Sequence, residues 1–136
     1  MTLTCAFVGS HEDWEPNSAP LYDRLDALKL AHRAGIWTWA SFEPVVDPGA
    51  SLGLMGCCLP YTDTIKVGMF NHQGSCDWPN PEWRVQVAGI GWRAFALDAI
   101  RLLEPSHATY MLKHDLLKAA GFATLGAAID AAREAK

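Results

Sequence analysis

The sequence lacks a hydrophobic stretch long enough to cross a membrane, and it carries no excess of positive charge. A membrane-spanning helix needs about 20 consecutive apolar residues, and no run in this chain approaches that length. Eleven Lys and Arg against 15 Asp and Glu give a formal net charge of -4, so the chain as a whole is not a basic nucleic-acid-binding domain. The first residues also lack the basic segment of a secretory signal peptide. We therefore expect a cytoplasmic protein with no membrane-spanning segment.

Cysteine is scarce, and its spacing indicates neither a disulfide framework nor a metal site. The four cysteines are Cys5, Cys57, Cys58 and Cys76. They form no C-x-x-C and no C-x-x-x-C-x-x-C motif, so we expect reduced thiols that pack as small apolar side chains. Phosphate-loop, dinucleotide-fingerprint, H-E-x-x-H and nucleophile-elbow motifs are absent as well. The sequence therefore predicts no metal ligands and none of these common classes of enzyme.

The chain contains alternating strand and helix patterns, in a number that fits a single domain. Its 136 residues are half apolar, enough for one core, so we expect one domain over residues 1–136. Strands are expected at 2–8, 36–42, 64–70 and 109–112. Helices are expected between Ser18 and Gly35 and over about 49–58, 92–104, 115–120 and 124–135. Residues 72–91 show no periodicity and are expected to be a loop insertion.

This alternation predicts the fold class. Strands that alternate with helices form parallel sheets through right-handed crossovers. Four such units are half of an eight-stranded barrel. We therefore expect an α/β fold, a partial (β/α) barrel of about four β/α units with parallel strands. An open half-barrel exposes sheet edges and an apolar face, which favours association with a partner or with itself.

Polar side chains follow the expected strands at the edge where parallel sheets carry their functional groups. Glu15 follows the first strand, Glu43 ends the second, Asn71 and His72 end the third, and Lys113 ends the fourth. Carboxylates, an amide, an imidazole and an ammonium group at one edge are typical of a ligand site. Each of these residues also has a structural alternative to a role in ligand binding. Each carboxylate can cap backbone N–H groups or complement a helix dipole, Asn favours turns, and the lysine can be solvated.

The tryptophans of the second expected strand lie on one face of it. Trp37 and Trp39 are two residues apart, so their side chains point to the same side of a strand. We expect them in the core rather than as platforms on which nucleic-acid bases stack. His11, His32 and His107 lack metal-ligand spacing, and we expect structural roles for them.

The residues from Ala31 to Pro48 resemble a known family. This stretch reads AHRAGIWTWASFEPVVDP. It resembles the later half of radical S-adenosylmethionine (SAM) proteins of the spore photoproduct lyase or DNA repair photolyase type, in which a helix ends in Ala-His-x-x-Gly-Ile and a strand ends in Ser-Leu-Glu-Pro-Val followed by Asp-Pro. Further matches occur in the same order at Trp14-Glu15-Pro16, Lys66-Val67-Gly68, Asn71-His72, Trp92-Arg93-x-Phe95 and Tyr110 to Leu116. The resemblance covers roughly residues 1–120, apart from 73–90.

The resemblance implies a function and a set of cofactors. It implies the C-terminal half of a radical SAM barrel, whose full-length relatives hold a [4Fe–4S] cluster and SAM and generate a 5′-deoxyadenosyl radical. Glu43, Asn71 and Lys113 would line the ligand-facing edge, with Glu15 and His72 beside them. DNA is a partner by family analogy alone. The family's C-x-x-x-C-x-x-C cluster motif is missing here, so we expect the isolated chain to be inactive without an N-terminal half-barrel polypeptide.

Two alternatives stay open on the sequence. The first is a non-catalytic half-barrel that serves as a binding or assembly module and buries its open edges against a partner or a second copy. The second is a different small α/β enzyme that uses Glu43 and His72 as acid and base, with no requirement for iron or SAM.

Overall fold

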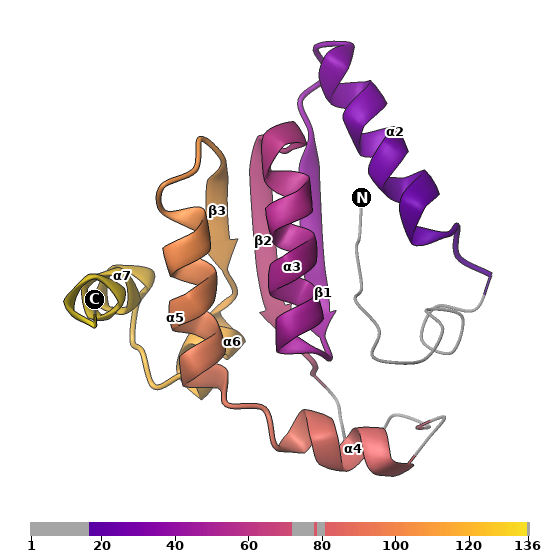
Figure 1. Ribbon diagram of the computed structural model, residues 1–136. Helices are drawn as coiled ribbons and strands as arrows, with labels where there is room; N and C mark the ends of the chain where they lie inside the picture. The colour runs from indigo at the N-terminus through magenta and orange to yellow at the C-terminus, as the bar shows by residue number, and fades with distance from the viewer. Residues whose placement is uncertain (1–16, 72–77, 79–80, 136) are drawn as a thin grey trace.

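The computed structural model describes residues 17–71, 78 and 81–135 (Figure 1). In chain order, the elements are α2 (Leu21–Arg33), β1 (Trp39–Val45), α3 (Pro48–Cys58), the 3-10 helix η1 (Leu59–Tyr61), β2 (Thr64–Met69), α4 (Pro81–Ala88), α5 (Trp92–Leu103), β3 (Thr109–Leu112), α6 (His114–Ala119) and α7 (Leu125–Glu134). No helix among these is long and apolar enough to span a bilayer.

The three strands form one parallel sheet in the order β1-β2-β3. With six helices around it, this is a mixed α/β fold, and the described residues form no barrel of four β/α units. The predicted half-barrel is therefore wrong. Alternation of strands and helices is a local pattern, whereas barrel curvature depends on strand tilt and stagger, which that pattern does not encode. The strand expected at 2–8 lies outside the described residues.

Most element positions agree with the sequence patterns, and two differ. The strand expected at 36–42 begins three residues later and runs to Val45. Residues 81–88, expected in the loop insertion, form helix α4, which starts at Pro81 with Glu82 in its first turn. Proline is favoured at the first helical position because its missing N–H has no intrahelical partner there.

Residues beside the helices define where two of them begin and end. Asp47 precedes α3, and its side chain accepts a hydrogen bond from the N–H of Ala50 at 2.9 Å. Gly35 ends α2 with φ of 73°, and its N–H donates to the carbonyl of His32. The N–H of Ile36 donates to the carbonyl of Ala31, which completes a Schellman motif. The predicted end of this helix is confirmed.

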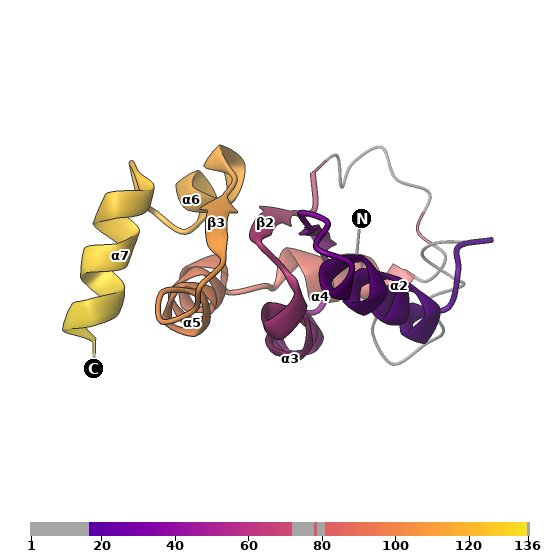
Figure 2. The ribbon, with the colours of Figure 1, turned by 90° about the horizontal axis from the view of Figure 1, so that it is seen from above.

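The core lies between the sheet and the helices α3 and α5, which pack on the same face of the sheet (Figure 2). Ala40 and Phe42 of β1 and Ile65 and Val67 of β2 point into this core and are almost fully buried. Leu54, Met55, Phe95, Ala96 and Ile100 meet them from the two helices. One face of each strand is therefore apolar and covered.

The opposite face of the sheet, called the second face below, carries different side chains because successive residues of a strand alternate between faces. It contains Trp39, Ser41 and Glu43 of β1, Lys66 and Gly68 of β2, and Met111 followed by Lys113 at β3. Trp37 and Trp39 are 73% and 47% exposed, so their prediction as core residues is wrong. They lie on the side of β1 away from α3 and α5.

Candidate functional site

Glu43, Lys66 and Lys113 form a three-charge cluster on the second face, and we call it the carboxyl-edge cluster. The carboxylate of Glu43 accepts a hydrogen bond from the ammonium group of Lys113. Its other oxygen lies 3.2 Å from Nζ of Lys66. The three side chains are only 22–32% exposed. The partly buried group therefore takes one charge from β1, one from β2 and one from the residue that directly follows β3.

Parallel pairing explains why the three residues meet. Lys66 lies opposite Ser41 on one side and opposite Met111 on the other. Glu43 lies two residues beyond Ser41, where the pairing of β1 with β2 shifts register between Phe42 and Val45. Lys113 directly follows β3, and its N–H donates to the carbonyl of Val67 at 2.9 Å. Both outer strands thus place a charge beside the carboxyl end of β2.

Gly68 leaves the space in which Glu43 and Lys113 meet across the middle strand. A β-carbon added at Gly68 would lie 2.8 Å from Cδ of Lys113 and 2.9 Å from Cδ of Glu43. Any other residue would therefore push at least one of these side chains away. The Glu43–Lys113 ion pair requires a glycine here for steric reasons, not for an unusual backbone conformation.

The electrostatics of the cluster favour an ionised carboxylate. Burial raises the pKa of Glu43, but hydrogen bonds and charge attraction from Lys113 and Lys66 together outweigh burial and hold that pKa below the ordinary value of a glutamate. Two ammonium groups share this one carboxylate, which leaves one positive charge in excess.

The predicted site residues lie in different surroundings in the structure. It brings Glu43 and Lys113 together, as expected for residues at the carboxyl ends of parallel strands. Asn71 lies near the same edge, but its side-chain amide donates to Asp115 at 3.4 Å, which ties the end of β2 to α6. Glu15 and His72 lie outside the described residues.

Sequence reasoning did not select Lys66 as a site residue, although the residue stands in one of the quoted motifs. It is a mid-strand lysine, and the prediction considers only residues at the ends of strands. Its alternation with the apolar residues Ile65 and Val67 was the available signal, because it placed Lys66 on the face opposite the core.

A second polar group lies at the other end of the sheet and has a structural role. Asp63 accepts hydrogen bonds from the N–H of Thr38 at 2.7 Å and from its hydroxyl at 2.9 Å, and His32 lies 4.0 Å away. Hydrogen bonds from Thr38 lower the pKa of Asp63. The carboxylate holds the residue before β1 against the residue before β2, so its acceptor capacity is engaged in joining these segments.

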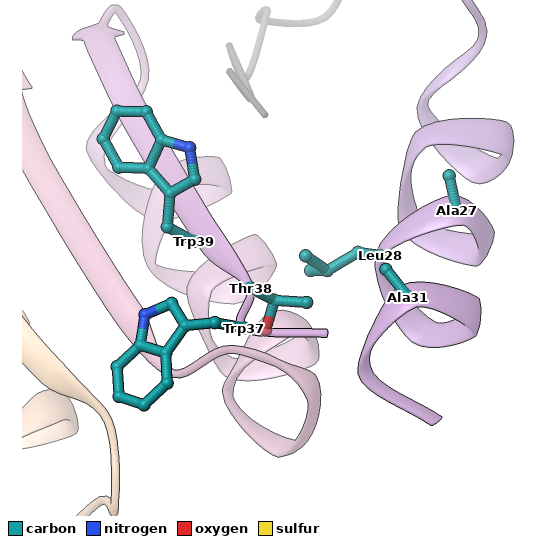
Figure 3. A pocket seen from close by; sticks show the side chains of 6 residues that line it. All are labelled: Ala27, Leu28, Ala31, Trp37, Thr38 and Trp39. Carbon is teal, nitrogen blue, oxygen red and sulfur yellow. The ribbon is translucent and has the colours of Figure 1, made fainter. Parts of the chain in front are cut away.

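A cavity of about 240 Å³ lies between α2 and the start of β1. It is lined by Ala27, Leu28, Ala31, Trp37, Thr38 and Trp39. Figure 3 shows Leu28 pointing toward β1, whereas both indole rings point away from α2. No ionisable side chain lines this cavity, so it offers packing rather than acid–base chemistry.

The described residues do not fit an iron–sulfur cluster. They contain no group of three or more His, Cys, Asp or Glu that could hold a metal ion. Cys57 is exposed on α3, whereas its neighbour Cys58 is buried in the core, so the two thiols face different surroundings. Cys5 and Cys76 lie outside the described residues. A cluster held by thiolates needs converging cysteines, which the described part does not provide.

The carboxyl-edge cluster does fit the charged part of SAM. The amino-acid portion of that cofactor carries one ammonium and one carboxylate group, and the cluster presents both signs of charge on one partly buried edge. The chain matches no family model, no curated protein and no solved structure. The family assignment therefore rests on the motifs of the sequence and stays a proposal.

Proposed function

We propose that this chain forms the ligand-binding edge of a radical SAM-type, spore photoproduct lyase-like protein. The observation that carries the proposal is the Glu43–Lys113 ion pair, which joins two of the family-like motifs across 70 residues of sequence. The pair lies at the carboxyl edge of a parallel sheet, and this edge is where α/β proteins bind their ligands.

Each residue of the edge has a chemical role in this proposal. Glu43 accepts hydrogen bonds from the ammonium group or the ribose hydroxyls of SAM, and its lowered pKa keeps it ionised at neutral pH. Lys66 and Lys113 hold the carboxylate in place and offer positive charge to an acidic group. SAM supplies the radical chemistry in the family that the sequence resembles. The chain's own part is to bind and orient.

In this proposal, the residues that bind the [4Fe–4S] cluster are not part of this sequence, because the C-x-x-x-C-x-x-C motif is missing. We predict that the purified chain, reconstituted anaerobically with iron and sulfide and supplied with a reductant and SAM, forms no 5′-deoxyadenosine. The product is measured by chromatography against a full-length radical SAM enzyme as positive control. Stoichiometric formation of 5′-deoxyadenosine by the chain alone would contradict the proposal that this chain lacks the residues that bind the [4Fe–4S] cluster.

Equilibrium dialysis with labelled SAM tests the proposed binding edge. We expect saturable binding to the chain and at least tenfold weaker binding to the Glu43→Gln variant, because the amide cannot replace the charge of the carboxylate. Glu104→Gln is the matched control. Glu104 also accepts hydrogen bonds from a neighbouring cation and a hydroxyl, Arg133 and Tyr110, but it lies at the other end of β3. No saturable binding, or equal losses in both variants, would refute the proposal.

A second candidate, a non-catalytic binding or assembly module, is favoured by one observation. Leu30, Ile36 and Trp37 are 59–73% exposed and follow one another from the end of α2 toward β1. Exposed apolar groups of this size often mark a protein contact. Sedimentation that shows a stable dimer, together with an absence of SAM binding, would favour this candidate over the first.

A further inference from the structure

The carboxyl-edge cluster has more positive than negative charge, and SAM does not balance it. Two ammonium groups converge on one carboxylate, at a surface where their side chains are about one quarter to one third exposed. The amino-acid part of SAM is a zwitterion and its sulfonium carries a further positive charge, so the arrival of SAM does not reduce the excess positive charge. The carboxylate of Asp115, at the start of α6, accepts a hydrogen bond from the side-chain amide of Asn71. An anionic group from a second ligand would complete the charge balance.

We propose that the carboxyl-edge cluster binds a phosphate group of the substrate, with Lys66 and Lys113 as the phosphate-binding residues. This inference rests on the proposed function for the location of the site, and it adds the chemical class of the substrate. Glu43 holds both ammonium groups in the ligand-free protein and competes with the phosphate for them.

The chemistry of lysine supports a phosphate in this position. An ammonium group is a compact charge with three donors on a flexible stem, and it suits phosphate oxygens approached from several directions. Gly68 gives the stem of Lys113 its space over the middle strand. Partial burial reduces the screening of these charges by salt. The exposed side chains of Trp39 and Met111 lie on the same face and offer an apolar surface to the rest of the ligand.

Two sources of phosphate share this chemistry, a phosphomonoester and the phosphodiester backbone of a nucleic acid. A 5′-mononucleotide and a single-stranded oligonucleotide without a terminal phosphate distinguish them. Binding of the first at the cluster identifies a monoester, and binding of the second a diester. Binding of neither would overturn the substrate class.

Titration with inorganic phosphate at constant ionic strength, followed by amide chemical shifts in NMR, tests the site without SAM. We expect saturable shifts around Gly68 and Lys113, and at least fivefold weaker binding in Lys113→Met and in Lys66→Met. Lys29→Met is the control, because it removes the same charge from a lysine that pairs with Asp26 on α2. Equal losses in Lys29→Met and Lys113→Met would show an effect of net charge alone and would overturn the proposal.

Glu43→Gln separates this inference from the proposed function. Removing the competing carboxylate is expected to leave phosphate binding equal or up to tenfold tighter, whereas the same variant is expected to weaken SAM binding. Phosphate binding with no SAM binding would refute the proposed function and keep the anion site. SAM binding with no phosphate binding would refute the anion site alone. Tenfold weaker phosphate binding in Glu43→Gln would also refute the role given to Glu43.

Discussion

At the scale of single residues, Gly68 leaves the space in which Glu43 and Lys113 form their ion pair. The side chains of Glu43 and Lys113 pass over its Cα, where any β-carbon would approach them to less than 3 Å. The flexible parts of both side chains can move aside, so the fold tolerates a larger residue while the ion pair does not. The consequence of a substitution should therefore appear first in the electrostatics of Glu43.

Gly68→Ala is expected to raise the pKa of Glu43 toward the ordinary value of a glutamate. The added methyl group separates the carboxylate from Lys113, and the attraction that lowers the pKa is lost. Carboxyl-carbon NMR measures the titration, and urea unfolding should show a loss of about 1 kcal/mol or less, the size of a partly exposed ion pair. Gly56→Ala is the control for the titration, because nothing lies within 4 Å of a β-carbon there. An unchanged titration of Glu43 in Gly68→Ala would show that the ion pair does not depend on the absence of a β-carbon at position 68.

The stability contributed by Glu43 is expected to depend on pH. Because its pKa is lower in the folded chain than in the unfolded chain, the contribution is complete above the unfolded value of about 4.3 and is lost as the pH falls through the folded value. Urea unfolding of the wild type and Glu43→Gln at several pH values measures it. Their difference in unfolding free energy should be largest above about pH 5 and should shrink in acid. A difference that is the same at all pH values would argue against an ionised pair.

The sequence places Glu43 and Lys113 at the same edge of the sheet because parallel strands bring their carboxyl ends together, and the structure pairs these two residues. Their role in binding a ligand stays a prediction. Lys66 is not among the predicted site residues, because the prediction considers only the ends of strands. The predicted burial of Trp37 and Trp39 is wrong, because β1 buries Ala40 and Phe42 in the core, and these residues alternate with the tryptophans.

At the scale of elements, helices with a regular apolar stripe were predictable and the helix without one was not. Helix α5 buries Phe95, Ala96 and Ile100 at helical spacing, and its predicted bounds agree with the structure to within one residue. Helix α4 buries only Val87, while Val85 is 74% exposed, so no stripe marks it. Its position follows from the packing of Val87 with Val46 and Phe70, which lie far from it in sequence.

The stability of helix α3 is expected to depend on Asp47, the residue that caps its start. Asp47→Ala removes the acceptor for the N–H of Ala50 and should lower the free energy of unfolding by about 1 kcal/mol. Urea unfolding measures this, with Asp130→Ala as the control, because Asp130 is an exposed acid in the interior of α7. Equal effects of the two substitutions would mean that only the loss of negative charge matters.

At the scale of the whole molecule, the larger of the two described hydrophobic cores joins the sheet to helices α3 and α5. Phe42 is 1% exposed and belongs to the same buried cluster as residues of α3, α5, α6 and α7. The sequence predicts a parallel sheet, which the structure has, and a half-barrel, which the described residues do not form. Apolar periodicity determines which residues are buried, whereas curvature depends on how whole strands tilt and pair.

Phe42→Ala is expected to destabilise the entire fold by about 3–5 kcal/mol, the usual cost of removing a buried aromatic ring. Urea unfolding followed both by tryptophan fluorescence and by circular dichroism measures this, and the two signals should shift together. Tyr22→Ala is the control, because Tyr22 is 80% exposed and its loss should change stability by less than about 0.5 kcal/mol. Separate transitions in the two signals would show that the core is not shared.

The distance along the chain between Glu43 and Lys113 has a consequence for the order of folding. The two residues are 70 positions apart: Glu43 lies in β1 and Lys113 directly follows β3, and these two strands do not pair with each other. Their contact forms only after β1 and β3 have both joined β2, and closing so long a loop is slow relative to forming the helices. The ionised pair is therefore a late event. A folding experiment that follows the Glu43 carboxylate would report the moment at which the sheet is complete.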